Sequence, residues 1–282
     1  IVDNDLAVIT SIDIDHTDFL GSTREEIGFE KAGIFRANKP VVIGEPNVPQ
    51  PMLEQAEKLH CHVSRRDVTW SFKANEQTWM WQSNKVRLEN LPFCQIPLAN
   101  AATALAAVEQ MPFDISVDTI KRSLIEVELV GRFQQLKGNQ LEKLADRLNM
   151  PYSQLPKVII DVGHNPHAAK YLAEKLTALK TQISGRIIAV CGVLKDKDAE
   201  SVFTQLTSVI DQWYCVTLGG YRGQSGDDLN AKLTSVYPSA KSVSKDSVVE
   251  GVQSAVKNAD KNDIVLVFGS FHTVGEFLEY LA

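Results

Sequence analysis

The second half of the sequence predicts an α/β fold built on a mostly parallel, doubly wound sheet. Four apolar runs have the composition of buried strands, and a pattern typical of a helix follows each of them: residues 158–161, 187–193, 213–218 and 264–268. A weaker fifth strand is expected at residues 241–244. Regular alternation of strands and helices gives right-handed crossovers, so the strands lie parallel and helices cover both faces. Functional side chains are then expected at the carboxyl ends of the strands.

The first half is less regular. Its predicted strands and helices are, in order, residues 6–14, 41–43, 50–60, 98–111 and 116–127, of which the first two are strands. Ser22 and Glu25 have the spacing of a capping box, which predicts a helix from about residue 23 to residue 35. Residues 62–93 contain three tryptophans among alternating polar positions, a pattern typical of a small antiparallel meander: Trp70, Trp79 and Trp81.

Length and the change in pattern predict two domains. A chain of 282 residues fits about two domains at roughly 150 residues each. The boundary is expected in the segment Leu129–Phe133, which gives domains of residues 1–129 and 130–282, and residues 137–157 read as a polar insertion. The chain has no initial Met and runs from Ile1 almost directly into a strand pattern. We therefore expect it to be a fragment of a longer protein.

Composition and charge exclude several classes of function. Apolar residues make up 44% and charged residues 23%, as in ordinary globular proteins. The net charge is −6, and a nucleic-acid binder would carry a basic face, so no nucleic acid is expected as a partner. The four cysteines form no CxxC pair, which favours a reducing, cytoplasmic location over a disulfide framework or zinc site. No apolar run reaches the roughly 18 residues of a membrane span, so no membrane is expected either.

The sharpest local signal is the segment DVGHNPH, residues 161–167. It follows a predicted buried strand, and Asn165 and Pro166 are suited to cap and begin a helix. The segment therefore places the Asp161 carboxylate and the His164 imidazole at a strand end, beside helix N–H groups that attract anions. An ordinary strand-to-helix turn with capping residues would have the same pattern, so both interpretations stay open.

A second predicted strand ends in the segment DHTD, residues 15–18. The imidazole of His16 among carboxylates could coordinate a divalent metal, and magnesium would accept such a site with water or phosphate at the remaining positions. A lone histidine after a strand is also compatible with a structural role. Lys31 lies on the helix that follows, and nothing in its local sequence distinguishes it from a solvated surface lysine.

Three further segments are compatible with binding or with plain structure. They are FGSFHT at residues 268–273, LANAA at residues 98–102 and the loop GGYRG at residues 219–223. The sequence contains neither the phosphate-binding pattern G-x-x-x-x-G-K-[ST] nor G-x-G-x-x-G after a strand, and the second absence counts against a dinucleotide-dependent oxidoreductase. The residues alone therefore predict an α/β protein with a site for an anionic ligand between two domains.

The motifs and their order resemble one known family. The stretch from Ile9 to Pro46, ITSIDIDHTDFLGSTREEIGFEKAGIFRANKPVVIGEP, is similar to the bacterial folylpolyglutamate synthase/dihydrofolate synthase family of the Mur ligase superfamily. LANAATAL, GRFQ, DVGHNP and FGSFHTV follow in the family's order and extend the resemblance over nearly the whole chain. The resemblance implies that residues 1–129 are the remainder of a Mur-type central ATP-binding domain. Residues 130–282 would be the Rossmann-like C-terminal glutamate ligase domain.

The family implies an ATP-dependent amide ligation. ATP phosphorylates a carboxylate of dihydropteroate or of a folate's terminal glutamate, and the amine of L-glutamate then displaces the phosphate. Positioning and neutralisation of phosphate charge supply the catalysis. The implied ligands are dihydropteroate or folate, L-glutamate, ATP and Mg²⁺, and a cytoplasmic monomer is expected.

Site residues are carried over where this sequence matches the family's motifs. His16 matches a magnesium ligand, and Lys31 matches a lysine that the family carbamylates, which would make it a catalytic group and an oxygen ligand for the metal. Asn100, Arg132 and Asp161 match ATP contacts near the adenine, the phosphates and the ribose. His16 and Lys31 are expected within metal-site distance of each other, facing the Asp161 turn across the interdomain cleft.

The remaining expectations concern the glutamate end and what the chain lacks. His164 is expected to be catalytic, and Ser270 and Thr273 are expected in the glutamate or phosphate region. The family's P-loop, a metal-binding Glu and most of the pterin site belong to an N-terminal portion outside this sequence, so the fragment alone is expected to be inactive. Gly163 stands where the family more often has Ala, and residues 134–157 lengthen the path from Arg132 to Asp161.

Two alternatives to a folate ligase stay open. Another Mur-type ligase that joins an amino acid to a non-folate carboxylate would use the same nucleotide chemistry. A truncated, non-catalytic module that acts only by binding belongs to a different class, and the region upstream of Ile1 would discriminate it.

Overall fold

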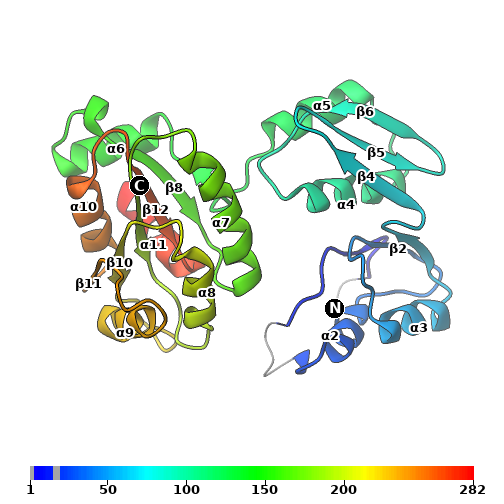
Figure 1. Cartoon of the computed structure of the whole chain (residues 1–282). Helices are drawn as coiled ribbons and strands as arrows, with labels where there is room; N and C mark the ends of the chain where they lie inside the picture. Colours follow the sequence, from blue (N-terminus) through cyan, green and yellow to red (C-terminus); the bar gives the residue numbers. More distant parts are fainter. Residues whose placement is uncertain (1–2, 15–19) are drawn as a thin grey trace. The chain divides into compact units, whose positions relative to one another are not determined.

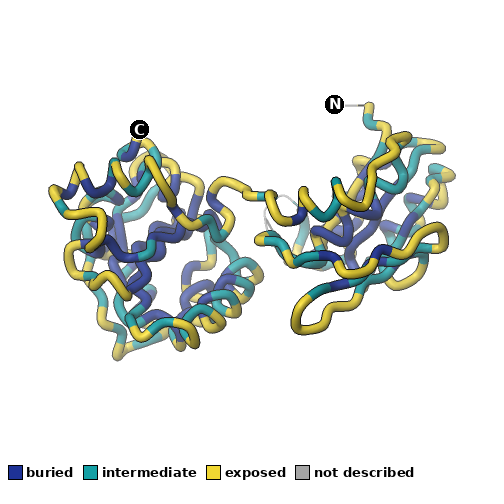
Figure 2. The backbone as a smooth tube through the Cα atoms, turned by 90° about the horizontal axis from the view of Figure 1, so that it is seen from above, coloured by how far each residue is buried: buried dark blue, intermediate teal, exposed yellow. Residues whose placement is uncertain are grey.

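The structure is a computed structural model that describes residues 3–14 and 20–282. The chain divides into two compact units, Ile1–Glu128 and Leu129–Ala282, and each unit has a buried interior of its own (Figures 1 and 2). Both units are α/β, as the sequence predicts. That residues 1–129 are the last part of a central ATP-binding domain stays a prediction. Among the described residues, no helix is long and apolar enough to span a membrane.

The first unit contains a three-stranded parallel sheet in the order β1-β2-β3. Its strands are β1 (Ala7–Ile9), β2 (Pro40–Ile43) and β3 (His62–Arg65). The central strand is an apolar run, Val41 to Ile43, and is fully buried because both of its faces are covered. Helices α2 (Arg24–Ala32) and α3 (Gln50–Lys58) connect the strands and pack against one another.

A separate antiparallel sheet follows in the same unit. It consists of β4 (Trp70–Ala74), β5 (Trp79–Ser83) and β6 (Arg87–Leu91), with helices α4 (Leu98–Glu109) and α5 (Val117–Glu126) packed beside it. Trp70 and Trp81 stack in its core with ring centroids 6.3 Å apart. The predicted meander is confirmed for residues 70–91. Residues 62–65 were wrongly included, because alternation alone does not say which neighbour a strand pairs with.

Helix α2 begins one residue later than predicted. Thr23 is its N-cap and accepts the Glu26 N–H, while the Glu26 carboxylate accepts the Thr23 N–H at 3.1 Å. Hydrogen bonds from the Ser22 and Thr23 N–H groups hold the pKa of Glu26 below its usual range. The predicted pair, Ser22 and Glu25, has the same spacing, so the pattern alone could not choose between them. The helix also ends at Ala32 rather than near residue 35.

The second unit is one six-stranded sheet in the order β11-β10-β9-β12-β8-β7. All neighbouring pairs are parallel except β7 with β8, which is antiparallel. The strands are β7 (Gln134–Gln135), β8 (Lys157–Asp161), β9 (Ile187–Cys191), β10 (Gln212–Val216), β11 (Ser242–Lys245) and β12 (Ile264–Phe268). The five predicted strands are confirmed, including the weaker one as β11.

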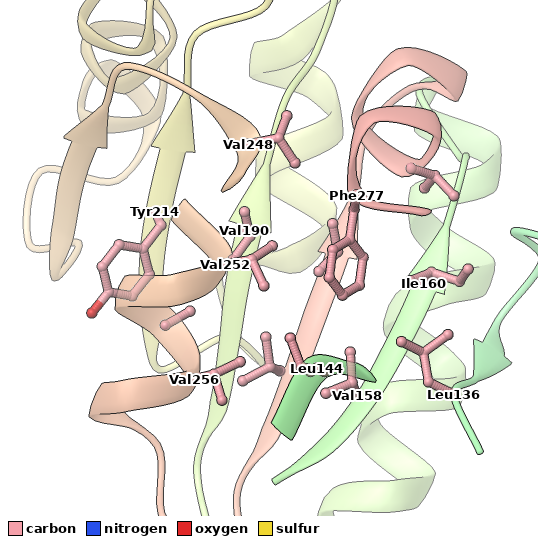
Figure 3. Close-up of a cluster of buried hydrophobic side chains, with 14 of the residues drawn as sticks. Leu136, Leu144, Val158, Ile160, Val190, Tyr214, Val248, Val252, Val256 and Phe277 are labelled. Carbon is pink, nitrogen blue, oxygen red and sulfur yellow. The ribbon is translucent and has the colours of Figure 1, made fainter. Parts of the chain in front are cut away.

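Helices cover both faces of this sheet. They are α6 (Asn139–Leu148), α7 (Pro166–Lys180), α8 (Ala199–Leu206), α9 (Gly226–Val236), α10 (Val248–Asn258) and α11 (Phe271–Leu281). Side chains of α6, α10 and α11 form one core with the sheet, where Ile160 and Val190 lie near Val252 and Phe277 (Figure 3). Side chains of α7, α8 and α9 form the other core, in which Phe203 meets Trp213 edge to face at 5.4 Å. Because the helices cover the two faces of the sheet, a binding site is expected at the carboxyl ends of the parallel strands.

The predicted insertion is part of this unit. Within residues 137–157 the chain forms α6 and a 3₁₀ turn, Tyr152–Gln154. Leu144 and Leu148 of α6 are buried in the core that α10 and α11 share. The excursion therefore leaves from β7, covers one face of the sheet and returns as β8, next to the strand from which it started.

Candidate active site

The Asp161 carboxylate ends β8 and is buried, with 8% of the residue exposed. Its Oδ1 accepts the Gly163 N–H at 2.6 Å, and its Oδ2 accepts the Phe133 N–H at 2.8 Å. Burial raises the pKa of Asp161, although these two hydrogen bonds and the charges of Arg132 and His164 act in the opposite direction. The carboxylate is thus held by backbone from two segments that lie far apart in the sequence.

The rest of the DVGHNP turn is shaped around this carboxylate. A Cβ on Gly163 would lie 2.7 Å from Asp161 Oδ1, so glycine leaves the room that the acid needs. Asn165 caps α7 by accepting the Ala168 N–H at 2.8 Å, as predicted. His164 Nδ1 lies 3.0 Å from the Val162 carbonyl oxygen, which can only accept. Nδ1 therefore carries the proton of the neutral imidazole, and Nε2 is the nitrogen that can accept one.

Arg132 is brought to the same turn by the segment that enters the second unit. Its N–H bonds the Leu129 carbonyl at 3.0 Å in a tight turn in which Gly131 has a φ of 70°. The Gly131 carbonyl in turn accepts the Val162 N–H at 2.8 Å. The exposed guanidinium lies over the Phe271 ring, with Cζ 5.9 Å from the centroid. The long insertion therefore does not separate Arg132 from Asp161.

Ser270 and Thr273 lie at the start of α11 and are buried. Ser270 Oγ is the N-cap and accepts the Thr273 N–H at 3.0 Å. Thr273 Oγ1 donates to the Gly192 carbonyl at 2.7 Å and lies 2.7 Å from Ser270 Oγ. These hydroxyls tie α11 to the end of β9, and their predicted contact with a substrate stays a prediction.

The loops after β9 and β10 also meet at the carboxyl ends of the strands. Arg222 forms a two-pronged ion pair with Asp196, with Nε–Oδ1 at 3.0 Å and Nη2–Oδ2 at 2.6 Å. The Lys195 ammonium lies 4.7 Å from the centroid of the Tyr221 ring, which is 90% exposed. The sequence showed the loop of residues 219–223 only as a flexible segment with one cation. Its partner Asp196 has no sequence signal, because the pair joins two separate loops.

In the first unit, Lys31 is half-buried in the last turn of α2. No other residue in the described ranges forms an ion pair or hydrogen bond with its ammonium group. Asn100 is exposed in the first turn of α4. His16 lies outside the described residues. No group of three or more His, Cys, Asp or Glu that could hold a metal is found over residues 3–14 and 20–282. The predicted convergence of His16 and Lys31 on the Asp161 turn stays a prediction.

Sequence reasoning missed a buried carboxylate in the first unit. Glu45 follows β2 and accepts the Ile12 N–H at 2.9 Å and the Asn47 N–H at 3.0 Å. Arg24 binds Glu45 Oε1 at 3.1 Å and also donates to the Ile12 carbonyl. These contacts join the start of α2 to the segment that leads into the DHTD motif. The pair joins the first residue of α2 to a residue just after β2, 21 positions later, so no local pattern in the sequence signals it.

Comparison with known proteins decides the family. Residues 146–271 match the family described as Mur ligase, glutamate ligase domain. The dihydrofolate synthase/folylpolyglutamate synthase of Haemophilus influenzae is 70% identical over 277 residues, which cover 98% of this chain and 63% of that protein. Over nearly its whole length the chain is thus similar to the dihydrofolate synthase/folylpolyglutamate synthases. It spans less than two thirds of the length of this relative.

Solved structures of this family have the same fold as the chain. The structure described as E. coli FolC in complex with DHPP and ADP is similar with a TM-score of 0.85 at 40% identity, covering 99% of this chain and 61% of that one. A bifunctional folylpolyglutamate synthase/dihydrofolate synthase with Mn, AMPPNP and L-glutamate bound has a TM-score of 0.82 at 41% identity, with coverage of 99% and 62%. The predicted family and fold class are confirmed.

Proposed function

We propose that this chain carries the glutamate ligase domain and part of the ATP site of a folate ligase. The reaction is the ATP-dependent joining of L-glutamate to dihydropteroate and to the γ-carboxylate of folates. The observation that carries the proposal is the 70% identity, over 98% of the chain, to a relative named for both activities. The clustering of Arg132, Asp161 and His164 at the carboxyl ends of the strands supports it.

The chemistry needs phosphate charge to be neutralised and reactants to be held in line. The γ-phosphoryl group of ATP passes to the substrate carboxylate, and the amine of glutamate attacks the acyl carbon as phosphate leaves. Arg132 suits the phosphates because its guanidinium is exposed and supported by the Phe271 ring. A charge-assisted contact of this kind contributes about 1.5–3 kcal/mol.

The other predicted residues have roles that fit their surroundings. His164 Nε2 can accept a proton and would take one from the ammonium group of glutamate, which gives the neutral amine that attacks the acyl carbon. Asp161 serves the ribose side of the nucleotide site, and the exposed Asn100 amide serves the adenine. Ser270 and Thr273 shape the glutamate end through the start of α11.

The fit of Mg²⁺ depends on the state of Lys31. Mg²⁺ takes oxygen ligands, and the ammonium of an unmodified lysine cannot provide one, whereas a carbamate can. We propose that His16 and carbamylated Lys31 hold the ion, which when bound would neutralise charge on the ATP phosphates. We also propose that the protein is a monomer and works in the cytoplasm. The free Cys191 and Cys215 thiols suit the reducing conditions of that compartment.

A chimera tests the proposal directly. This chain would replace the matching part of the Haemophilus influenzae relative, and ADP release would be measured with dihydropteroate or a reduced folate, each with and without L-glutamate. We expect release that requires glutamate with both acceptors. The 282-residue chain alone should release no ADP, because its sequence has no P-loop. Glutamate-dependent release with a cell-wall precursor but with neither folate substrate would identify a different Mur-type ligase.

Matched arginine variants separate the site from the scaffold. Arg147 on α6 lies over the Tyr280 ring at 5.0 Å, much as Arg132 lies over Phe271, but it is not among the predicted site residues. In the chimera, Arg132→Ala should lower kcat/KM about 10- to 150-fold, which corresponds to about 1.5–3 kcal/mol. Arg147→Ala should leave kcat/KM nearly unchanged. Equal losses in the two variants would contradict the proposed role of Arg132.

A further inference from the structure

The backbone around Arg132 has an unusual conformation. Phe133, the next residue, has a φ of 45°, in the left-handed region that bulky side chains rarely adopt. Two residues earlier, Gly131 has a φ of 70°, and a Cβ there would lie 2.8 Å from Val162 Cγ1. Strained conformations of this kind persist only where the surrounding structure holds them in place. Contacts with neighbouring parts of the unit must therefore hold the backbone of residues 131–133 in this conformation.

Hydrogen bonds on both sides of Arg132 supply that constraint. After Arg132, the Phe133 N–H donates to Asp161 Oδ2 at 2.8 Å. Before it, the Gly131 carbonyl accepts the Val162 N–H at 2.8 Å, and the Gly131 N–H donates to Gln134 Oε1 at 3.0 Å. The pairing of β7 with β8 continues the contact along the chain. Arg132 is thus the centre of a short segment that is fastened to the end of β8.

We propose that Asp161 is a positioning residue, whose carboxylate fixes the backbone that presents Arg132 at the end of the sheet. Both carboxylate oxygens already accept an N–H, Oδ1 from Gly163 and Oδ2 from Phe133, and 8% of the residue is exposed. The acid therefore acts through Arg132, in addition to any contact of its own with a nucleotide. Holding a guanidinium in place before its ligand arrives lowers the entropy lost on binding.

This inference rests on the proposed function only in its statement that Arg132 binds the phosphates of ATP. The hydrogen bond from Phe133 to Asp161 exists in the structure without any ligand. The positioning role can therefore be tested on the chain alone, and its consequence for ATP can be tested separately. If the chimera bound no ATP, the proposed function would fail, while the first test would still decide whether Asp161 fixes the segment.

The first test is amide hydrogen exchange on the 282-residue chain without nucleotide. Asp161→Ala removes both acceptors, and we expect the Phe133 amide to exchange about tenfold faster or more. Asp161→Asn keeps one acceptor oxygen and should show a smaller increase in the summed exchange of the Phe133 and Gly163 amides. Asp263→Ala is the matched control, because Asp263 is also a buried acceptor of backbone N–H groups in this unit but precedes β12. Because Asp263→Ala lowers the stability of the whole unit, it should speed the exchange of the Phe133 amide by no more than the measured fall in the free energy of unfolding accounts for.

A measurement on the unaltered chain guards against variants that fail to fold. A scalar coupling across the hydrogen bond, from the Phe133 nitrogen to the Asp161 carboxyl carbon, should be detectable by NMR. If this coupling is absent and the Phe133 amide exchanges at the rate of an unprotected one, the carboxylate does not hold the segment. Protection of Phe133 that survives Asp161→Ala would overturn the inference in the same way.

The second test is a double-mutant cycle on ATP affinity in the chimera. Residues that act as a unit give non-additive losses. With Arg132 present, Asp161→Asn should weaken ATP binding about tenfold, and with Arg132→Ala already made the loss should be clearly smaller, the remainder coming from the contact of Asp161 with the ribose. An equal loss in the two backgrounds would mean that Asp161 does not act through Arg132, and would overturn the proposal.

Discussion

Replacement of Asp263 by Ala should destabilise the second unit strongly. The carboxylate is 3% exposed and accepts the N–H groups of Arg186 at 2.6 Å and Asp260 at 3.0 Å. It also binds the Arg186 side chain at 2.8 Å and 3.1 Å. Leaving a buried donor without its acceptor costs about 1–3 kcal/mol. Because the Arg186 side chain is 41% exposed, water replaces much of that contact, and the ion pair adds little.

The two backbone donors therefore set the magnitude, and the free energy of unfolding should fall by about 2–4 kcal/mol. At about 2–4 °C per kcal/mol for a domain of this size, Tm should fall by about 5–15 °C. Burial alone would raise the pKa of Asp263, but hydrogen bonds from Arg186 and Asp260 and the charge of Arg186 hold it below its ordinary value. The stabilisation is thus present above the unfolded pKa of about 3.9 and is lost as the pH falls through the folded pKa.

Urea unfolding of the wild-type chain and of Asp263→Ala at pH 7 and at pH 3 measures both effects. Alkylation of the Cys191 and Cys215 thiols, both buried in the second unit, reports the unfolding of that unit, whereas three of the four tryptophans lie in the first unit. The difference in unfolding free energy should be large at pH 7 and should shrink at pH 3. A difference below about 0.5 kcal/mol at pH 7, the size expected of an ordinary surface substitution, would refute the reasoning. So would a difference that does not change between the two pH values.

Two further predictions concern single residues of the second unit. Gly131→Ala should lower the free energy of unfolding by about 1–2 kcal/mol or more in the same urea assay. The new Cβ would meet Val162, and the φ of 70° suits glycine. Unchanged stability would argue against the close approach of Gly131 to Val162. Burial raises the pKa of the Cys215 thiol to about 12. Cys215 should therefore resist alkylation at pH 8 in the folded chain and react when the chain is unfolded. Mass spectrometry that finds the Cys215 peptide labelled in the native state would contradict this.

The sequence predicted the strands of the second unit well because their signal is local. Each is a short run of β-branched and apolar residues, such as Val158 to Ile160, that becomes buried on both faces. The capping box was misplaced by one residue because Ser22 and Thr23 each have a Glu three positions later. Residues 62–65 were assigned to the wrong sheet because pairing partners are not encoded in the pattern of one strand.

The candidate site was predictable in its residues but not in its contacts. Asp161, His164 and Asn165 form a motif that is visible in seven consecutive letters. The bond from Phe133 to Asp161 joins residues 28 positions apart, and the pair of Arg222 with Asp196 joins residues 26 positions apart. No local pattern reports such contacts, because they follow from which strands become neighbours. The convergence of His16 and Lys31 on the Asp161 turn is a prediction of the same kind.

The antiparallel strand β7 has a practical consequence for any attempt to isolate the glutamate ligase domain. Residues Gln134 and Gln135 pair with Ile160 and Ile159, and the Leu136 N–H bonds the Val158 carbonyl at 2.9 Å. A protein cut at residue 146, where the match to the domain family begins, would lack this strand. The backbone of β8 would then become an open template for a strand from another molecule, and self-association would follow. Expression of the domain should therefore start upstream of Leu129, so that the chain shields its own sheet.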